Sequence, residues 1–117
     1  MKGIHLTPIG DGYVLLEPKD SLNPQDPDIY LQEIVEQLHT YNANALFYDL
    51  KKIPLIDAIY YEWLRTLSRL CKLSNVELVV VNTQPTAAYG LAVQLGKDKV
   101  NFKAALDVER ARKGIWL

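Results

Sequence analysis

The chain has 117 residues and a formal net charge of −1, and 49% of its residues are hydrophobic while 23% are charged. This composition excludes a disordered chain, and the length favours one globular domain over residues 1–117. The near-neutral charge argues against nucleic acid as a partner, because nucleic-acid-binding domains are usually strongly basic.

The first predicted elements are two strands, residues 3–7 and 13–17. They flank Gly10-Asp11-Gly12, and Asp-Gly is a strong signal for a tight hairpin. Pro18–Pro27 follows as a long loop, because its prolines and Asx residues favour turns. Asp26 is placed to cap the next helix, with Pro27 as its first residue.

Two helices and two strands are predicted in the middle of the chain. Ala45–Asp49 and Val76–Val81 are continuous apolar runs, typical of strands that are buried on both faces. Asp57 can cap the longer helix, which lies between these strands. The predicted apolar face of the first helix is Leu31, Ile34, Val35 and Leu38, and that of the longer helix is Tyr60, Trp63, Leu64, Leu67, Leu70 and Cys71.

The last third of the chain predicts a helix, an edge strand and a short final helix. Thr83 can cap the first of these helices, with Pro85 in its first turn and Gly96 at its end. The half-covered edge strand carries Val100, Phe102, Ala104 and Leu106 on one side, and Asp107 caps a helix that ends before Gly114.

The predicted order is therefore β-β-α-β-α-β-α-β-α. Strands that alternate with helices imply parallel crossovers. We expect an α/β fold with a central mixed sheet, an N-terminal hairpin, parallel β-α-β crossovers and helices packed on the sheet.

The sequence contains no pattern that indicates an enzyme, a metal site or a cofactor. His5, His39 and Cys71 each stand alone in their segments, and neither a glycine-rich phosphate loop nor a nucleophile elbow is found. Asp11, Asp49 and Asp57 fall at strand or loop ends, as in a magnesium-binding carboxylate cluster. However, a hairpin turn explains Asp11 and a helix cap explains Asp57.

Features that would direct the chain to a membrane or out of the cell are also not found. The apolar runs are far shorter than the roughly 20 residues that cross a bilayer. The first residues contain no export signal. The single cysteine excludes an intrachain disulfide and favours a reducing compartment. We expect a cytoplasmic protein with no membrane partner.

The turn before the longer helix is the most informative local feature. Residues 53–61 bring Asp57 and Ala58 to the start of that helix. Free backbone amides and a positive dipole at a helix N-terminus suit an anion or a phosphoryl group. A hydroxyl at this place could receive phosphate, but Ala58 has none.

Here the sequence resembles a STAS domain, whose signature is a buried strand ending in Asp, a short hydrophobic turn, and Asp-Ser or Asp-Thr opening a helix. The matching pieces are Leu46-Phe-Tyr-Asp49, Ile53-Pro-Leu-Ile56 and Asp57-Ala58. Further pieces resemble the stand-alone anti-sigma-factor antagonists of the RsbS type, which are stressosome scaffold proteins, and the likeness covers essentially the whole chain. These pieces are the Gly10-Asp11 hairpin, Val79-Val-Val-Asn-Thr-Gln-Pro85, Gln94-Leu-Gly96 and Ala105-Leu-Asp-Val-Glu-Arg110.

The resemblance implies a non-enzymatic switch component in a bacterial stress-response pathway. In this family a serine kinase of the anti-sigma-factor type phosphorylates the residue after the Asp, which weakens binding, and RsbR-like paralogues assemble with RsbS-like proteins into stressosomes. The expected partners are therefore such a kinase and RsbR-like paralogues, in a homo- or hetero-oligomer.

Two positions depart from the family pattern. Ala58 replaces the phosphoacceptor, either as a natural loss of kinase control or as a substitution introduced into the chain. Asn82 replaces the usual glycine after the valine run and is expected to reshape that loop.

The resemblance marks Asp57 and Ala58 as the regulatory turn. Partner contacts are expected at Ile59, Tyr61, Glu62, Arg65, Thr83 and Gln84. Tyr61 falls off the apolar face of its helix and is expected to be exposed beside Ala58, where an aromatic residue suits an interface. The alternative is a small-ligand or nucleotide-binding sensor, with Asp49, Asp57 and Thr83 gathered beyond the carboxyl ends of the strands.

Overall fold

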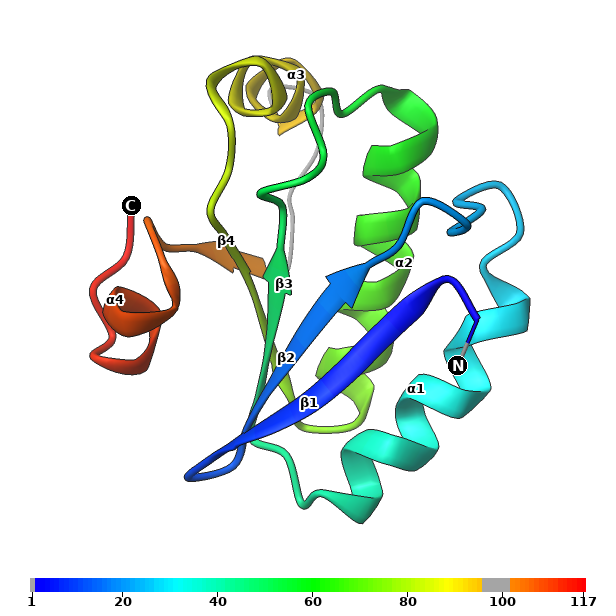
Figure 1. The fold of residues 1–117 in the computed structure, drawn as a ribbon, viewed down its shortest axis with the longest axis vertical. Coiled ribbons are helices and arrows are strands. Elements are labelled where there is room, and N and C mark those ends of the chain that lie inside the picture. Colours follow the sequence, from blue (N-terminus) through cyan, green and yellow to red (C-terminus); the bar gives the residue numbers. More distant parts are fainter. Residues whose placement is uncertain (1, 96–101) are drawn as a thin grey trace.

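The structure, a computed structural model, describes residues 2–95 and 102–117. Its strands form one sheet in the order β1-β2-β3-β4-β5 (Figure 1). The strands β1 and β2 pair antiparallel, and every later pair is parallel. Their bounds are β1 (Ile4–Gly10), β2 (Tyr13–Pro18), β3 (Ala45–Asp49), β4 (Glu77–Val81) and β5 (Phe102–Ala104).

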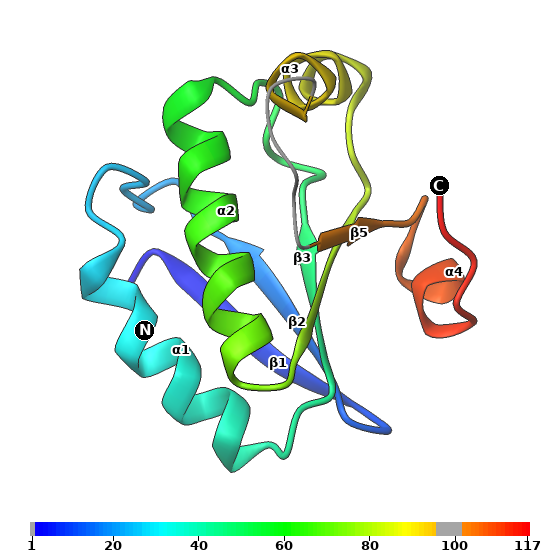
Figure 2. The same ribbon diagram turned by 180° about the vertical axis from the view of Figure 1, so that it is seen from behind.

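The helices are α1 (Asp28–Thr40), α2 (Ala58–Leu73), α3 (Pro85–Leu95) and α4 (Val108–Arg112). Figures 1 and 2 show α1 and α2 side by side on one face of the sheet, α4 on the opposite face, and α3 beyond the carboxyl ends of β3 and β4. The predicted order of elements, the N-terminal hairpin and the mixed sheet are confirmed. No helix in the described ranges is long and apolar enough to cross a membrane.

The core lies on both faces of the sheet. Every residue of β3 is buried, as its continuous apolar run predicts. Leu46 and Tyr48 join the large cluster under α1 and α2, whereas Ala45 and Phe47 join a smaller cluster under α4. Leu67, in the middle of α2, has no exposed surface.

The start of α1 differs from the prediction. Pro27 is itself the N-cap residue, it already has helical backbone angles, and no side chain caps the helix. The predicted cap by Asp26 is therefore wrong, because the cap position lies one residue later. The buried face also includes Tyr30, which the prediction omitted, while Leu31 is only half-buried.

The last strand is shorter than predicted. It is an edge strand, as expected, but it ends at Ala104. Ala105 is then buried and Leu106 is 54% exposed, so the predicted alternation fails where the chain turns toward α4. The predicted helix end at Gly96 and the strand residue Val100 lie outside the described residues.

Candidate functional site

The turn before α2 has the predicted form. Asp57 is the N-cap, and its carboxylate Oδ1 accepts a hydrogen bond from the backbone N–H of Tyr60 at 2.8 Å. Ala58 is the first residue of α2 and is exposed. The side chain of residue 58 therefore faces solvent at the positive end of the longest helix.

Helix α3 and the residue before it, Gln84, hold the segment that leads into this turn. The side-chain amide of Gln84 donates to the carbonyl of Lys51 at 2.5 Å, and the hydroxyl of Thr86 donates to the carbonyl of Pro54. Gly90 lies so close to the carbonyl of Ile56 that a Cβ atom there would overlap the oxygen. We call these three contacts the α3 clamp.

A buried carboxylate organises the ends of β3 and β4. Asp49 is only 4% exposed, and its Oδ1 accepts hydrogen bonds from the backbone N–H of Lys51 at 3.0 Å and from Nδ2 of Asn82 at 3.1 Å. The ammonium of Lys51 lies 3.3 Å from Oδ2. These contacts fix Lys51, near the start of the loop that runs from β3 to Asp57.

Asn82 keeps the backbone conformation that a glycine would favour. Its φ of 59° lies in the left-handed region, which glycine and, less readily, asparagine adopt. Its side chain adds the bond to Asp49. The structure therefore accounts for asparagine at this position, and the effect of the replacement on the shape of the loop stays a prediction.

A hydrogen-bonded aromatic group joins the first turns of α2 to β3. Nε1 of Trp63 donates to the hydroxyl of Tyr48 at 2.8 Å, and the hydroxyls of Tyr48 and Tyr60 are 2.7 Å apart. Burial raises the pKa of Tyr48 well above its usual value and raises the pKa of Tyr60 to about 12. Both phenols are therefore neutral near pH 7, and the group fixes the orientation of α2.

Two of the predicted partner-binding residues lie beside Ala58. Ile59 is 43% exposed and Glu62 is exposed. Together with Ala58 they line a hollow of about 530 Å³ whose other residues include Pro24 and Pro27 from the loop before α1. The Asp57-Ala58 turn thus borders a surface depression built by two segments that are distant in sequence.

The remaining predicted contacts are divided between the core and the far side of the turn. Tyr61 is 3% exposed, so the expectation that it lies on the surface is wrong. Helix α2 contacts α1 and α3 as well as β4, and Tyr61 belongs to the large core cluster. Arg65 is half-buried with its guanidinium 3.7 Å from Glu62, while Thr83 and Gln84 are half-buried in the segment before α3.

The acidic residues that suggested a ligand or metal site are separated by function. Asp11 lies in the hairpin turn, 3.2 Å from the guanidinium of Arg112. Asp57 caps α2. The carboxylate of Asp49 accepts its hydrogen bonds from Lys51 and Asn82, and neither Asp57 nor Thr83 is among these partners. Among the described residues, no group of three or more His, Cys, Asp or Glu side chains is arranged to hold a metal ion.

Sequence reasoning missed the α3 clamp. The available signal was Gly90, because a glycine inside a helix weakens the helix and often marks a close approach of another backbone. The roles of Thr86 and of the two loop prolines had no comparable signal, since each depends on a segment more than 30 residues away.

No protein-family model matches this sequence, and no curated protein matches it with significance. Solved structures do match. RsbS of Moorella thermoacetica, solved with a serine-to-glutamate substitution, has a TM-score of 0.77 at 19% identity, and the match covers 94% of each chain. A stressosome structure, described as a signal integration and transduction hub, gives 0.77 at 19% identity over 95% of each chain.

A third structure comes from another organism. A Thermotoga maritima protein assigned as an anti-sigma factor antagonist has a TM-score of 0.70 at 16% identity, with 96% of this chain and 93% of that chain covered. At these identities the likeness concerns the fold. The chain has the STAS fold of these proteins, as the sequence resemblance led us to expect.

Proposed function

We propose that the chain is a non-enzymatic protein-interaction module of a bacterial partner-switching pathway, of the anti-sigma-factor-antagonist and stressosome type. Its partners are a serine kinase and RsbR-like paralogues in the cytoplasm. The fold shared with RsbS supports this proposal. The observation that carries it is the exposed Asp57-Ala58 turn, held by a cap on one side and the α3 clamp on the other.

The position of Ala58 suits a switch that acts on binding without unfolding the protein. A negative charge at the start of a helix interacts favourably with the helix dipole, by about 0.3–1 kcal/mol. The same charge, buried without a partner in an interface, typically costs several kcal/mol. A phosphoryl group at residue 58 would therefore leave the fold intact and weaken a complex formed through the turn.

Because Ala58 has no hydroxyl, this chain retains the unphosphorylated form of the turn. In a partner-switching pathway the unphosphorylated form is the one that binds. The chain therefore acts as a binding partner that the kinase cannot release through residue 58.

The direct test is Ala58→Glu, measured against the cognate serine kinase or RsbR-like paralogue. The melting temperature should stay unchanged or rise slightly. A loss of about 3 kcal/mol in binding would weaken affinity more than 100-fold. The matched control is Leu73→Glu, because residue 73 is 86% exposed at the opposite end of the same helix. Unchanged binding by Ala58→Glu would show that the turn is not the contact surface.

Phosphorylation gives a second test of the same turn. The cognate kinase should leave the chain unlabelled at this turn, and Ala58→Ser should acquire one phosphate there, detected by mass spectrometry. An active kinase that leaves Ala58→Ser unlabelled would contradict the assignment of Asp57 and Ala58 as the regulatory turn.

A further inference from the structure

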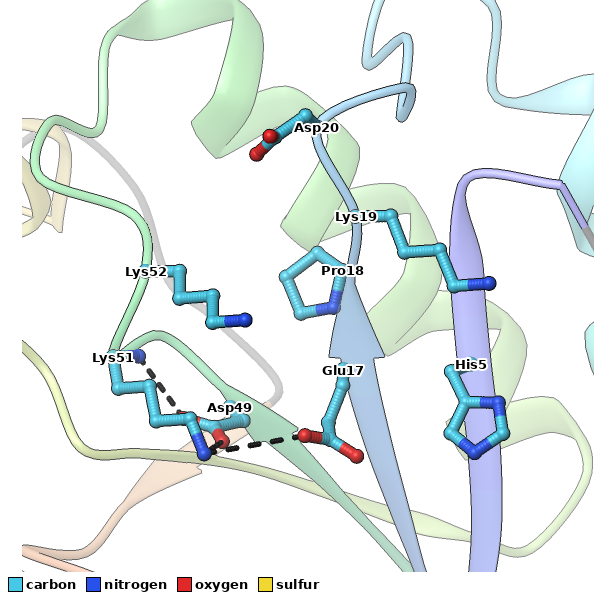
Figure 3. Close-up of a pocket in the computed structure, with 8 residues that line it drawn as sticks. All are labelled: His5, Glu17, Pro18, Lys19, Asp20, Asp49, Lys51 and Lys52. Carbon is cyan, nitrogen blue, oxygen red and sulfur yellow. Dashed lines mark hydrogen bonds and ion pairs between the residues drawn. The ribbon is translucent and has the colours of Figure 1, made fainter.

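A second hollow lies at the carboxyl ends of β2 and β3 (Figure 3). Its volume of about 380 Å³ falls at the low end of the range of about 300–1,000 Å³ that small-molecule sites occupy. A ligand that fits it is therefore small. Its lining residues are His5, Glu17, Pro18, Lys19, Asp20, Asp49, Lys51 and Lys52.

The floor of this hollow is a carboxylate pair that shares one ammonium group. Nζ of Lys51 lies 3.3 Å from Oδ2 of Asp49 and 3.9 Å from Oε2 of Glu17. Asp49 is buried and also accepts two N–H hydrogen bonds, whereas Glu17 is partly exposed and has only this longer contact. Glu17 therefore retains capacity to bind a second positive group.

The two sides of the hollow carry charged groups that the rest of the site does not use. Figure 3 shows the side chain of Lys52 extending from the loop after β3 across the hollow toward Pro18, and the carboxylate of Asp20 turned toward the same gap. In the described part of the chain, neither Lys52 nor Asp20 forms an ion pair. Among the described residues Lys19, which also lines the hollow, forms no ion pair either, so unpaired charges of both signs border one cavity.

The charge balance selects the class of ligand. The lining contains as many lysines as carboxylates, so the hollow is neutral when His5 is neutral. A simple anion that reaches Lys52 would also approach Asp49 and Glu17, and a simple cation would approach Lys51 and Lys52. Only a ligand with both charges places each of its groups near an opposite charge.

We propose that this hollow binds a small zwitterion with an α-amino-acid-like or dipeptide-like pair of charges. The carboxylate of the ligand pairs with Lys52, and its ammonium pairs with Glu17, whose carboxylate has spare capacity. Such charge-assisted hydrogen bonds are the strong ones in proteins. This site differs from the expected crevice of Asp49, Asp57 and Thr83, since Lys52 and Glu17 carry the recognition.

A ligand held by Lys52 would act on the segment that enters the regulatory turn. Lys51 and Lys52 begin the loop that ends at Asp57, and the carbonyl of Lys51 accepts the first bond of the α3 clamp. The proposed site therefore offers a route by which a metabolite alters the turn. The site itself does not depend on the proposed function, and its test requires no protein partner.

The test is a titration of the ¹⁵N-labelled chain followed by amide chemical shifts. The probes are glycylglycine and each common L-amino acid. Matched controls are N-acetylglycylglycine, which lacks the ammonium, glycylglycinamide, which lacks the carboxylate, and inorganic phosphate. At least one zwitterionic probe should shift the amides of residues 17, 19, 20, 51 and 52, and each control should bind at least about tenfold more weakly.

Variants then assign the charges. Lys52→Ala and Glu17→Gln should each weaken the binding of that probe about tenfold or more, while Lys113→Ala, a remote surface lysine, should leave it unchanged. The proposal fails if no probe shifts these amides at about 10 mM. It also fails if a singly charged control binds equally well, or if Lys52→Ala binds the probe like the unsubstituted chain. Partner binding without ligand, measured in parallel, tests the proposed function separately.

Discussion

Helices α1 and α2 cover the same face of the sheet, but their first turns are held in different ways. The start of α2 is fixed locally by the Asp57 cap. The start of α1 has no side-chain cap. Instead, Tyr30 in its first turn accepts a hydrogen bond from the backbone N–H of Asn23 at 2.8 Å, and its ring meets Trp63 edge to face at 5.7 Å.

Beyond their first turns, α2 is also packed more extensively than α1. Helix α2 buries six side chains and contacts α1, α3 and β4, whereas α1 buries three. The element that carries Ala58 is therefore held more firmly than α1. A partner that binds there meets a surface already in place, which lowers the entropic cost of association.

The largest expected difference between the helices comes from their buried leucines. Leu67→Ala in α2 should lower the free energy of unfolding by about 2–5 kcal/mol, because burial is lost and a cavity remains. Leu31→Ala in α1 should cost less, since Leu31 is half-buried. Urea denaturation measures both values. A cost below about 1 kcal/mol for Leu67→Ala would contradict the described packing of α2.

The α3 clamp can be broken with one methyl group. Gly90→Ala places a Cβ against the carbonyl of Ile56, and overpacking of this kind costs about 1–3 kcal/mol. In an unhindered helix the same change stabilises the protein by up to about 1 kcal/mol. The sign of the change in stability therefore shows whether Gly90 packs against the carbonyl of Ile56. Thermal unfolding would reveal it, and a higher melting temperature would show that α3 does not clamp the turn.

The pH dependence of the free energy of unfolding tests the tight packing of α2, because this helix contains the buried thiol of Cys71. Burial raises the pKa of its thiol from 9.0 to about 12. Above pH 9 the unfolded chain releases this proton while the folded chain keeps it, so stability falls as the pH rises toward 12. Between pH 9 and 10 the loss is at most about 1.4 kcal/mol.

The control for this effect is Cys71→Ala. That variant is less stable at pH 7 because it loses buried volume, but its stability should decline less steeply between pH 9 and 10 than that of the unsubstituted chain. Equal slopes in urea titrations at these pH values would mean that the thiol is not shielded as the structure describes.

The smallest expected effects lie at the two caps. Asp57→Ala removes the acceptor for the amide of Tyr60 and should cost about 0.5–2 kcal/mol. Asp26→Ala should change stability by less than about 0.5 kcal/mol, because Asp26 caps nothing. Urea denaturation of these two variants shows which of the two helices has a stabilising N-cap. An equal loss in both variants would place a working cap at α1.

Local signals in the sequence were sufficient where a residue acts on its own element. Ala45–Asp49 predicts its strand to the residue, and Asp57 predicts its cap, because strand burial and capping depend on neighbours in the chain. Tyr61 was misplaced, since its burial in the core cluster depends on packing between elements that are distant in the sequence. The clamp and the hollow beside Glu17 likewise require knowledge of which loops meet in space.

The order of the strands in the sheet has a consequence for how the chain assembles. Each strand pairs with the next one in sequence, so a chain emerging from the ribosome can add every strand to an edge that already exists. No strand has to insert between two others. Arg112 connects the first strand to the last helix, because its guanidinium donates a hydrogen bond to the carbonyl of Ile9 at 2.9 Å. This bond can form only after all the strands are in place.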